Sequence, residues 1–345
     1  MQVQAVLFVI FVSFAGASLP GYDEQFAVNL LNAAAAAYPD KKEVAETCLG
    51  RAFGNSTNYQ VLTSATAICG NKDGDYCKAY LARSDVSRVF IIGIRGTEGF
   101  KQLFHETESG LGAGMYPANI SNNPNAKVVD YFYTASGNVF DTLRIQQNLN
   151  FSGREDYSVY VTGHSLGGAL ATLIAKRIVF SQLRNKDKVR LVTFGEPRVG
   201  NLDFAIEMRS ELDYMFRVVH GDDPIPHLPP CGDFDNDMFS KSCKMEGWHQ
   251  HSTEVYYYLT EKKMPLGKYK VCDFYNGEDK TCSDGESWAK RFVRDFFLNQ
   301  GKVMHLNYFN HMISDYGKHG CVDGAASTAI SCVLFVLAGL LALVY

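Results

Sequence analysis

Short runs of apolar residues along the chain predict buried β-strands, because a strand covered on both faces carries apolar side chains at nearly every position. The runs that stand out cover residues 89–94, 157–162, 189–194 and 215–219. Apolar residues at helical spacing precede or separate these runs, in a first helix from Asp23 to about Tyr38 and in residues 138–149 and 169–180. Strands that alternate with helices predict an α/β fold with a mostly parallel sheet and helices on its faces.

The first of these helices has recognisable ends. Asp23 can accept a hydrogen bond from a free N–H of the first turn, and Pro39 stops the helix. Another element is predicted to begin in the Val- and Tyr-rich residues 127–133. No internal repeat, low-complexity stretch or linker divides the sequence, so it predicts one domain, which we place at residues 18–323.

The N-terminus has the order of a secretory signal peptide, which we predict at residues 1–17. Residues 3–14 are nearly all apolar, and the small residues Ala15 and Ala17 then lead to a cleavage site before Ser18. No Lys or Arg precedes the apolar run, which departs from the usual pattern. A buried N-terminal strand is the alternative.

The C-terminal residues 324–345 form a hydrophobic tail without any charge. Small residues at 324–327 precede the apolar run, which is the order of a signal for a glycosylphosphatidylinositol (GPI) anchor, although the spacer is shorter than usual. A retained membrane span and a buried core helix are the alternatives. Together, the two ends predict a protein that is secreted or held at the extracellular face of the plasma membrane, GPI-anchored or C-terminally anchored.

Composition and charge narrow the class of protein. Apolar residues make up 46 % of the chain and charged residues 20 %, which allows a packed core and excludes global disorder. The net charge of −4 offers no general basic face, so nucleic acid is not expected as a partner. Neither property determines the oligomeric state.

Three N-x-S/T sequons, at Asn55, Asn119 and Asn150, fit passage through the secretory pathway and are predicted glycosylation sites. Eight of the nine cysteines lie outside the C-terminal tail, and an even number in an oxidising compartment implies up to four disulfides. A zinc site is the rival interpretation, but the sequence has no C-x2-C pair, and we expect no metal. Proximity along the chain suggests the pairs Cys69–Cys77, Cys231–Cys243 and Cys272–Cys282, which leaves Cys48 for Cys321.

The sharpest motif is Gly-His-Ser-Leu-Gly-Gly at residues 163–168, which follows a predicted strand and opens a predicted helix. This is the setting of the nucleophile elbow, a tight strand-to-helix turn that exposes a serine above the carboxyl edge of the sheet. Ser165 is therefore the candidate nucleophile. The main-chain N–H of Leu166, at the start of the helix, is placed to bind a developing oxyanion.

A serine nucleophile needs a base and an orienting carboxylate, which follow it in the chain order Ser, Asp, His in this fold. Asp222 and Asp223 both follow a predicted strand, and spacing alone does not separate them; both also suit an ordinary turn. Six downstream histidines are candidates for the base, each of which is by default a surface residue: His227, His249, His251, His305, His311 and His319.

The chain resembles the class 3 lipases, the fungal-lipase-like branch of the α/β-hydrolases. The matching stretches are Ile-Arg-Gly-Thr at 94–97, the elbow at 163–168, Gly-Glu-Pro-Arg-Val-Gly at 195–200, Asp-Pro-Ile-Pro-His-Leu-Pro-Pro at 223–230 and His-Leu-Asn-Tyr-Phe at 305–309. They span roughly residues 23–321. The additional cysteines, an insertion at 231–270 and the C-terminal tail depart from the family.

The resemblance implies roles for named residues. It implies a triad of Ser165, Asp223 and His305, and an oxyanion hole formed by the N–H groups of Thr97 and Leu166. The family also joins an early cysteine to one near its end, which supports Cys48–Cys321. Similar lipases carry a short lid after the oxyanion residue, here residues 98–106, where Phe100, Leu103 and Phe104 share one helical face. An ordinary packed amphipathic helix is the alternative for that segment.

These features lead to a serine carboxylic ester hydrolase, similar to a triacylglycerol lipase, that acts on lipid esters at a lipid surface through an acyl-enzyme. It is expected to need no cofactor. The alternatives are a catalytically inactive lipid-binding or adhesion module on the same fold, which has no need of a complete triad, and a peptidase. The sequence does not define the lipid head group, the acyl chain or the choice between triacylglycerol and phospholipid.

Overall fold

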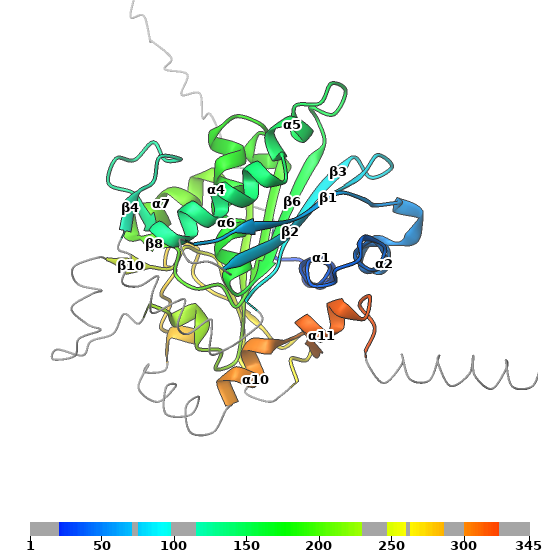
Figure 1. Cartoon of the computed structure of the whole chain (residues 1–345). Helices are drawn as coiled ribbons and strands as arrows, with labels where there is room; N and C mark the ends of the chain where they lie inside the picture. The colour runs from blue at the N-terminus through cyan, green and yellow to red at the C-terminus, as the bar shows by residue number, and fades with distance from the viewer. Residues whose placement is uncertain are drawn as a thin grey trace, which may run out of the picture.

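An eight-stranded sheet lies at the centre of the molecule (Figure 1). The structure, a computed structural model, describes residues 21–70, 75–97, 115–229, 247–259, 263–285 and 300–323. In spatial order the strands are β1 (Gln60–Ile68), β2 (Tyr76–Ser84), β3 (Val89–Ile94), β6 (Ser158–His164), β7 (Val189–Phe194), β9 (Tyr214–His220), β11 (Glu254–Tyr257) and β12 (Lys270–Val271).

The predicted parallel sheet is confirmed in its middle and differs at its edges. Strands β3, β6, β7, β9 and β11 are parallel, whereas β1, β2 and β12 pair antiparallel. Pairing of Ile94 with Gly163, and of His164 with Phe194, brings the carboxyl ends of β3, β6 and β7 to one edge. Loops that leave this edge can therefore share one site.

The predicted strands 89–94 and 189–194 match β3 and β7, and β6 and β9 extend to within two residues of their predicted limits. Strand β1, at the edge of the sheet, and its neighbour β2 were not predicted. Exposed and partly buried positions interrupt the buried ones in β1, and β2 carries the charged residues Lys78 and Arg83. Neither strand therefore has an unbroken apolar run.

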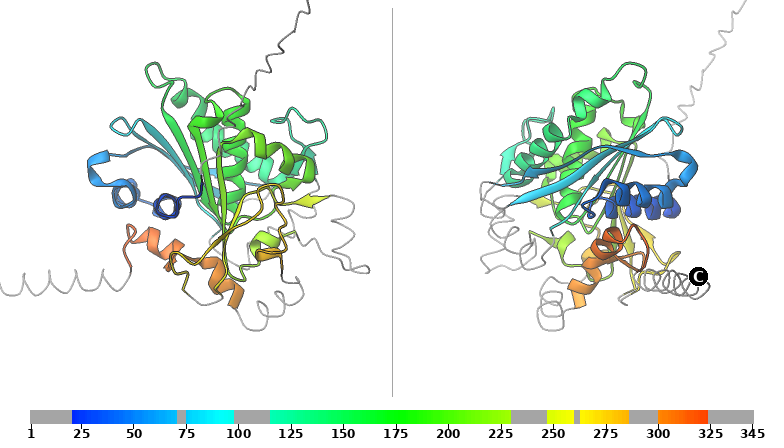
Figure 2. Two further views of the ribbon diagram at one scale, coloured as in Figure 1. Left: turned by 180° about the vertical axis from the view of Figure 1, so that it is seen from behind. Right: turned by 45° about the vertical axis from the view of Figure 1, so that its right-hand side comes forward.

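Helices cover both faces of the sheet (Figure 2). The first, α1 (Glu24–Ala35), begins as predicted, since the Asp23 side chain accepts a hydrogen bond from the N–H of Phe26 at 3.0 Å, and it ends three residues before Tyr38. Among the described residues, the other α-helices are α2 (Lys42–Phe53), α4 (Asp130–Thr142), α5 (Ile145–Leu149), α6 (Leu166–Phe180), α7 (Leu202–Glu211), α10 (Gln300–Leu306) and α11 (Ile313–Lys318).

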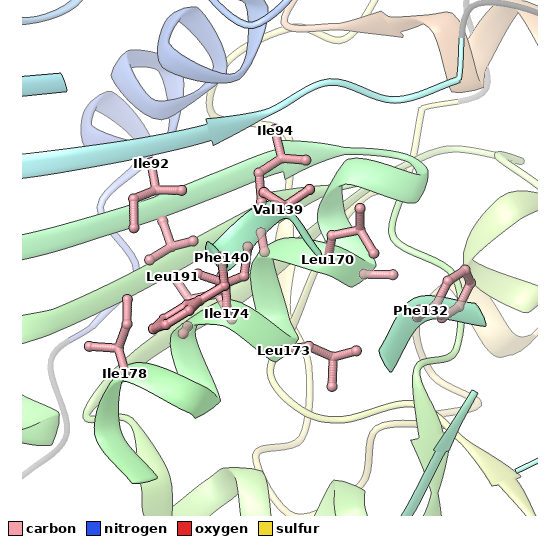
Figure 3. Packing of buried hydrophobic residues seen from close by; sticks show 14 of the residues in the cluster. Ile92, Ile94, Phe132, Val139, Phe140, Leu170, Leu173, Ile174, Ile178 and Leu191 are labelled. Carbon is pink, nitrogen blue, oxygen red and sulfur yellow. The ribbon is translucent and has the colours of Figure 1, made fainter. Parts of the chain in front are cut away.

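Each face of the sheet has its own hydrophobic cluster. On one face, α4 and α6 pack on the sheet, with Val139, Leu170 and Ile174 close to Ile92 and Leu191 (Figure 3). On the other face, α1, α2 and α11 pack against the opposite side chains of the same strands. Burial on both faces explains why the central strands are almost continuously apolar.

The helix predicted at residues 138–149 is instead two helices. Residues 127–129 form a short strand, β5 (Lys127–Val129), and α4 begins immediately after it at Asp130. Arg144, in a left-handed conformation with φ of 51°, separates α4 from α5. The apolar spacing continues through this break, so the pattern did not reveal it.

Smaller elements surround the sheet. A second sheet consists, in spatial order, of β10 (Trp248–His249), β8 (Gly200–Asn201), β5 (Lys127–Val129) and β4 (Met115–Pro117). A two-stranded ribbon, β13 (Asn307–Tyr308) and β14 (His311–Met312), follows α10. Short 3-10 turns are η1 (Asn55–Thr57), η2 (Lys186–Lys188), η3 (Ile225–His227) and η4 (Ser283–Gly285).

The structure contains disulfides between Cys48 and Cys321, Cys69 and Cys77, and Cys272 and Cys282. The first joins α2 to the segment after α11, 273 residues apart in the sequence. Cys231 and Cys243 lie outside the described residues, as do the predicted signal peptide, the C-terminal tail and the candidate lid.

The described residues include the three predicted glycosylation sites. The sequon asparagines Asn55, Asn119 and Asn150 are all exposed, so each is accessible to a glycosyltransferase. In the part of the chain that the structure describes, no helix combines the length and the apolar character needed to cross a bilayer.

Candidate active site

Ser165 lies at the sharp turn between β6 and α6, with φ of 58° and ψ of −129°. A β-carbon at Gly163 would lie 2.1 Å from the carbonyl oxygen of Gly167, and one at Gly167 would lie 2.3 Å from that of Ile94. Both positions therefore require glycine, as the elbow motif predicts. The strained turn holds the serine hydroxyl at the carboxyl edge of the sheet.

His305 lies between Ser165 and Asp223. Its Nε2 is 2.9 Å from the Oγ of Ser165, and its Nδ1 is 3.0 and 2.9 Å from the two carboxylate oxygens of Asp223. An ionised carboxylate only accepts hydrogen bonds, so Nδ1 carries the proton and Nε2 is free to accept the serine hydroxyl proton. The three predicted triad residues thus form one hydrogen-bonded line, although α10 and β6 are far apart in the sequence.

Asp223 follows β9 and is completely buried. Burial alone would raise the pKa of its carboxyl, but the interaction with His305, the Tyr308 hydroxyl at 2.6 Å and the Ile225 N–H at 2.9 Å together keep that pKa below its usual value. The carboxyl therefore stays ionised in the pH range where His305 must be oriented. Asp222 differs, since its main-chain N–H contacts the Met304 sulfur.

The other candidate histidines have different partners. His249 is part of β10, and His251 lies 3.1 Å from a carboxylate oxygen of Glu196. The remaining three lie near carboxylate oxygens, at 3.4 Å for His227 and Asp284, 2.8 Å for His311 and Asp323, and 3.5 Å for His319 and Asp315. Within the described residues, His305 is the histidine hydrogen-bonded to Ser165.

The oxyanion candidates flank the serine. Leu166 is the first residue of α6, so its N–H belongs to the first helical turn, whose donors have no carbonyl partner inside the helix. Thr97 lies three residues beyond the end of β3, next to the elbow through the pairing of Ile94 with Gly163. It is partly buried, and the chain that follows it at 98–114 is outside the described residues.

Comparison with known proteins identifies the family. The family model described as lipase (class 3) matches residues 91–233, which contain Thr97, Ser165 and Asp223. A lipase of Caenorhabditis elegans is 36 % identical over 313 residues, which cover 87 % of this chain and 83 % of that lipase. The chain belongs to the class 3 lipase family.

More distant relatives agree with this family. A secreted mono- and diacylglycerol lipase of Fusarium solani is 28 % identical over 213 residues, covering 60 % of this chain and 55 % of that protein. The crystal structure of a mono- and diacylglycerol lipase from Aspergillus oryzae superposes with a TM-score of 0.65 at 19 % identity, covering 85 % of this chain and 99 % of that one. This likeness shows the predicted α/β-hydrolase fold, and as a class 3 lipase the chain is a carboxylic ester hydrolase of lipid esters.

Two residues of this class 3 lipase contact the triad without a role foreseen from the sequence. Tyr308 donates its hydroxyl to Asp223, and Gly195 has a positive φ of 59°. A β-carbon at Gly195 would lie 2.7 Å from a carboxylate oxygen of Asp223 and 3.0 Å from Nδ1 of His305. Both residues lie in stretches shared with the family, at 305–309 and 195–200, and that was the only signal for them.

One group in the described part of this class 3 lipase has ligand atoms close enough for a metal ion, namely Glu254, Cys272 and Cys282. Its two sulfur atoms are joined in a disulfide, so they are not free thiolates. The group therefore lacks the donor set that a zinc site needs.

Proposed function

We propose that this class 3 lipase hydrolyses acylglycerol-type esters through a Ser165–His305–Asp223 triad and a covalent acyl-enzyme. The observation that carries the proposal is the unbroken line of hydrogen bonds from the Ser165 hydroxyl through both nitrogens of His305 to Asp223. Such a line activates a weakly acidic hydroxyl as a nucleophile, because the imidazole accepts its proton and the carboxylate stabilises the positive charge that results.

The reaction follows from this arrangement. The Oγ of Ser165 attacks the acyl carbon while its proton passes to Nε2 of His305, and Asp223 stabilises the resulting imidazolium. The main-chain N–H groups of Thr97 and Leu166 bind the negative oxygen of the tetrahedral intermediate. His305 then gives the proton to the departing alcohol, and a water molecule, activated by the same imidazole, cleaves the acyl-enzyme.

We further propose that residues 1–17 are removed as a signal peptide, that residues 18–323 form the mature hydrolase domain and that residues 324–345 direct its anchoring. Three observations support an extracellular location. The disulfides need an oxidising compartment, the three sequon asparagines are exposed, and the Fusarium solani relative is a secreted lipase. An anchor outside the cell would keep a lipid hydrolase beside its substrate.

The test of the proposed function is an assay of the purified, glycosylated protein on emulsified triolein, phosphatidylcholine vesicles and a short p-nitrophenyl ester. We expect release of fatty acid from triolein and complete dependence on Ser165, with Ser165→Ala as the control. Absence of hydrolysis with all three substrates, in protein that melts cooperatively, would reject the proposal. Hydrolysis of phosphatidylcholine alone would retain the chemistry and replace the acylglycerol substrate.

A further inference from the structure

Tyr38 is a buried tyrosine, 2 % exposed, in the turn that follows α1. The ammonium group of Lys78, on β2, fixes this turn by donating to the carbonyl of Pro39 at 2.6 Å and to the carboxylate of Asp40 at 2.6 Å. The turn therefore holds the tyrosine ring in one place without using its hydroxyl.

The Tyr38 hydroxyl contacts the residue before Thr97 on one side and His164 on the other. It accepts a hydrogen bond from the N–H of Gly96, immediately before Thr97, at 3.3 Å, and it lies 3.0 Å from Nδ1 of His164. On the other side of the His164 ring, Nε2 lies 2.7 Å from the main-chain carbonyl oxygen of His305. One chain of hydrogen bonds thus connects the oxyanion loop, which contains Gly96 and Thr97, to the main chain of His305. The chain passes through Tyr38 and His164.

The proton positions in this chain follow from the groups at its ends. A carbonyl oxygen only accepts, so Nε2 of His164 carries a proton and donates a hydrogen bond to the main-chain carbonyl of His305. In a neutral imidazole Nδ1 then has a lone pair, which accepts the hydroxyl proton of Tyr38. The tyrosine oxygen in turn accepts the N–H of Gly96, so every group in the chain is satisfied.

His164 has to remain uncharged for this chain to function. Its ring lies against that of His305, with centroids 4.6 Å apart, and burial lowers the pKa of His164 to about 3. When His305 takes the serine proton it becomes positively charged. A second charge on His164 would oppose that step, whereas a neutral donor to the His305 carbonyl does not.

We propose that Tyr38 and His164 are positioning residues that hold the oxyanion loop at Gly96 and the His305 peptide in register across the nucleophile. The proposal rests on the proposed function, because it assigns Thr97 and His305 their roles in hydrolysis. The polar atoms of the two positioning residues contact Gly96, each other and the His305 carbonyl, so we assign neither residue a contact with the substrate. Their loss should therefore reduce kcat and leave KM nearly unchanged.

The first test compares Tyr38→Phe with Tyr80→Phe. Tyr80 is equally buried, lies beside the same helix and donates its hydroxyl to the carbonyl of Ala33 at 2.7 Å, away from the triad. Both variants lose one buried hydroxyl and should melt at similarly lowered temperatures. We expect kcat to fall about ten-fold in Tyr38→Phe, with KM within about two-fold of the wild type, and to stay unchanged in Tyr80→Phe.

The second test examines the link itself. His164→Leu removes both the donor to the His305 carbonyl and the acceptor for Tyr38, so it should also lower kcat. If the two residues act in one chain, adding Tyr38→Phe to His164→Leu should cost little more than the larger single loss. Losses that multiply in the double variant would contradict a shared chain.

Other outcomes are equally decisive. Wild-type kcat in Tyr38→Phe, or an equal loss in Tyr80→Phe, would overturn the proposal while the wild-type enzyme still hydrolyses esters. If the wild-type protein itself shows no hydrolysis, the proposed function fails first. The two failures are therefore distinguishable.

Discussion

Within the part of the chain that the structure describes, two buried sets of side chains combine a hydroxyl, an imidazole and a carboxylate. One is Ser165, His305 and Asp223, and the other is Thr172, His251 and Glu196. All six residues are at most 1 % exposed. Similar composition and burial thus occur twice within one fold, and we propose catalysis for only the first.

The order of the hydrogen bonds separates the two sets. In the first, the hydroxyl and the carboxylate face opposite nitrogens of His305. In the second, Glu196 and Thr172 both lie near Nε2 of His251, at 3.1 and 3.4 Å, and Thr172 donates its proton directly to Glu196 at 2.6 Å. The threonine hydroxyl has given its hydrogen bond to the acid, so the imidazole does not activate it.

The backbone separates them as well. Ser165 stands on a strained turn at the end of a strand, whereas Thr172 lies inside α6, completely buried among neighbouring elements. Glu196 also accepts a hydrogen bond from Thr193, so the second set ties α6 to the end of β7 and to residues near 251. The comparison teaches that the order of the hydrogen bonds and the backbone position of the hydroxyl, and not the presence of the three groups, distinguish a catalytic set from a structural one.

The largest expected difference is between the two hydroxyls. Ser165→Ala should lower kcat on the order of a million-fold, because no nucleophile remains. Thr172→Ala should keep kcat within a few-fold of the wild type and lower the free energy of unfolding by about 1–3 kcal/mol, because it leaves a buried carboxylate with one partner fewer. Ester hydrolysis rates and urea denaturation of both variants measure this, and a catalytic collapse in Thr172→Ala would erase the distinction.

The acids of the two sets, Asp223 and Glu196, should differ as the two hydroxyls do, with only the first needed for catalysis. Asp223→Asn should reduce kcat roughly ten-thousand-fold, since an amide no longer fixes the tautomer of His305. Glu196→Gln should chiefly lower stability. Asp222→Asn is the matched control beside the triad acid, and steady-state kinetics should place it near the wild type. If Asp222→Asn lowered kcat more than Asp223→Asn does, the family motif would be aligned one residue out of register.

A smaller effect is expected at the oxyanion loop, for which the second set has no proposed counterpart. Thr97→Ala retains the main-chain N–H, so kcat should fall by less than the hundred-fold or more that is typical when a whole oxyanion donor is lost. Thr97→Ser, which keeps the hydroxyl, should stay closer to the wild type. Kinetics on a soluble ester would compare them, and wild-type activity in both would restrict the role of this residue to its backbone.

The smallest effect concerns the stability of the triad region in acid. The pKa of His164 falls from 6.5 to about 3 on burial, so the folded state binds fewer protons than the unfolded chain and stability decreases as the pH falls between these values. One such group contributes at most about 1.4 kcal/mol per pH unit. The titratable neighbours of His164 are His305, Asp223, Tyr38 and Tyr308, and all four remain in His164→Asn.

Urea denaturation of the wild type and His164→Asn at several pH values between about 7 and 4 would measure this contribution. The variant should lose stability less steeply than the wild type, although it starts from a lower value. Parallel curves would show that His164 is not the group that titrates on unfolding.

Much of the fold and of the site could be predicted from local sequence, for identifiable physical reasons. Strands β3 and β7 are continuously apolar because both their faces are covered, and the elbow around Ser165 needs glycines at fixed spacing. The choice of Asp223 and His305 among several candidates needed the family resemblance, because spacing alone left them open. In the structure, His305 is hydrogen-bonded to Ser165, and Asp223 is hydrogen-bonded to the other nitrogen of His305.

The features that could not be predicted depend on contacts between distant segments. Lys78 is acceptable in the buried strand β2 only because the turn after α1 supplies carbonyl and carboxylate oxygens. Tyr38 and His164 come together across 126 residues of sequence, and neither has a pattern around it that signals a partner. The structural set of Thr172, His251 and Glu196 is equally invisible in sequence, where these residues are separate from one another.

Covalent labelling tests most directly the claim that Ser165, and no other buried hydroxyl, is the activated nucleophile. The purified protein would be treated with diethyl p-nitrophenyl phosphate, which transfers its phosphoryl group to a serine activated by an adjacent base, and the modified peptide would be located by mass spectrometry. We predict one phosphoryl group per molecule, on Ser165, with loss of esterase activity in proportion to labelling. A label on Thr172 or another residue, or full activity in protein labelled at Ser165, would contradict the assignment.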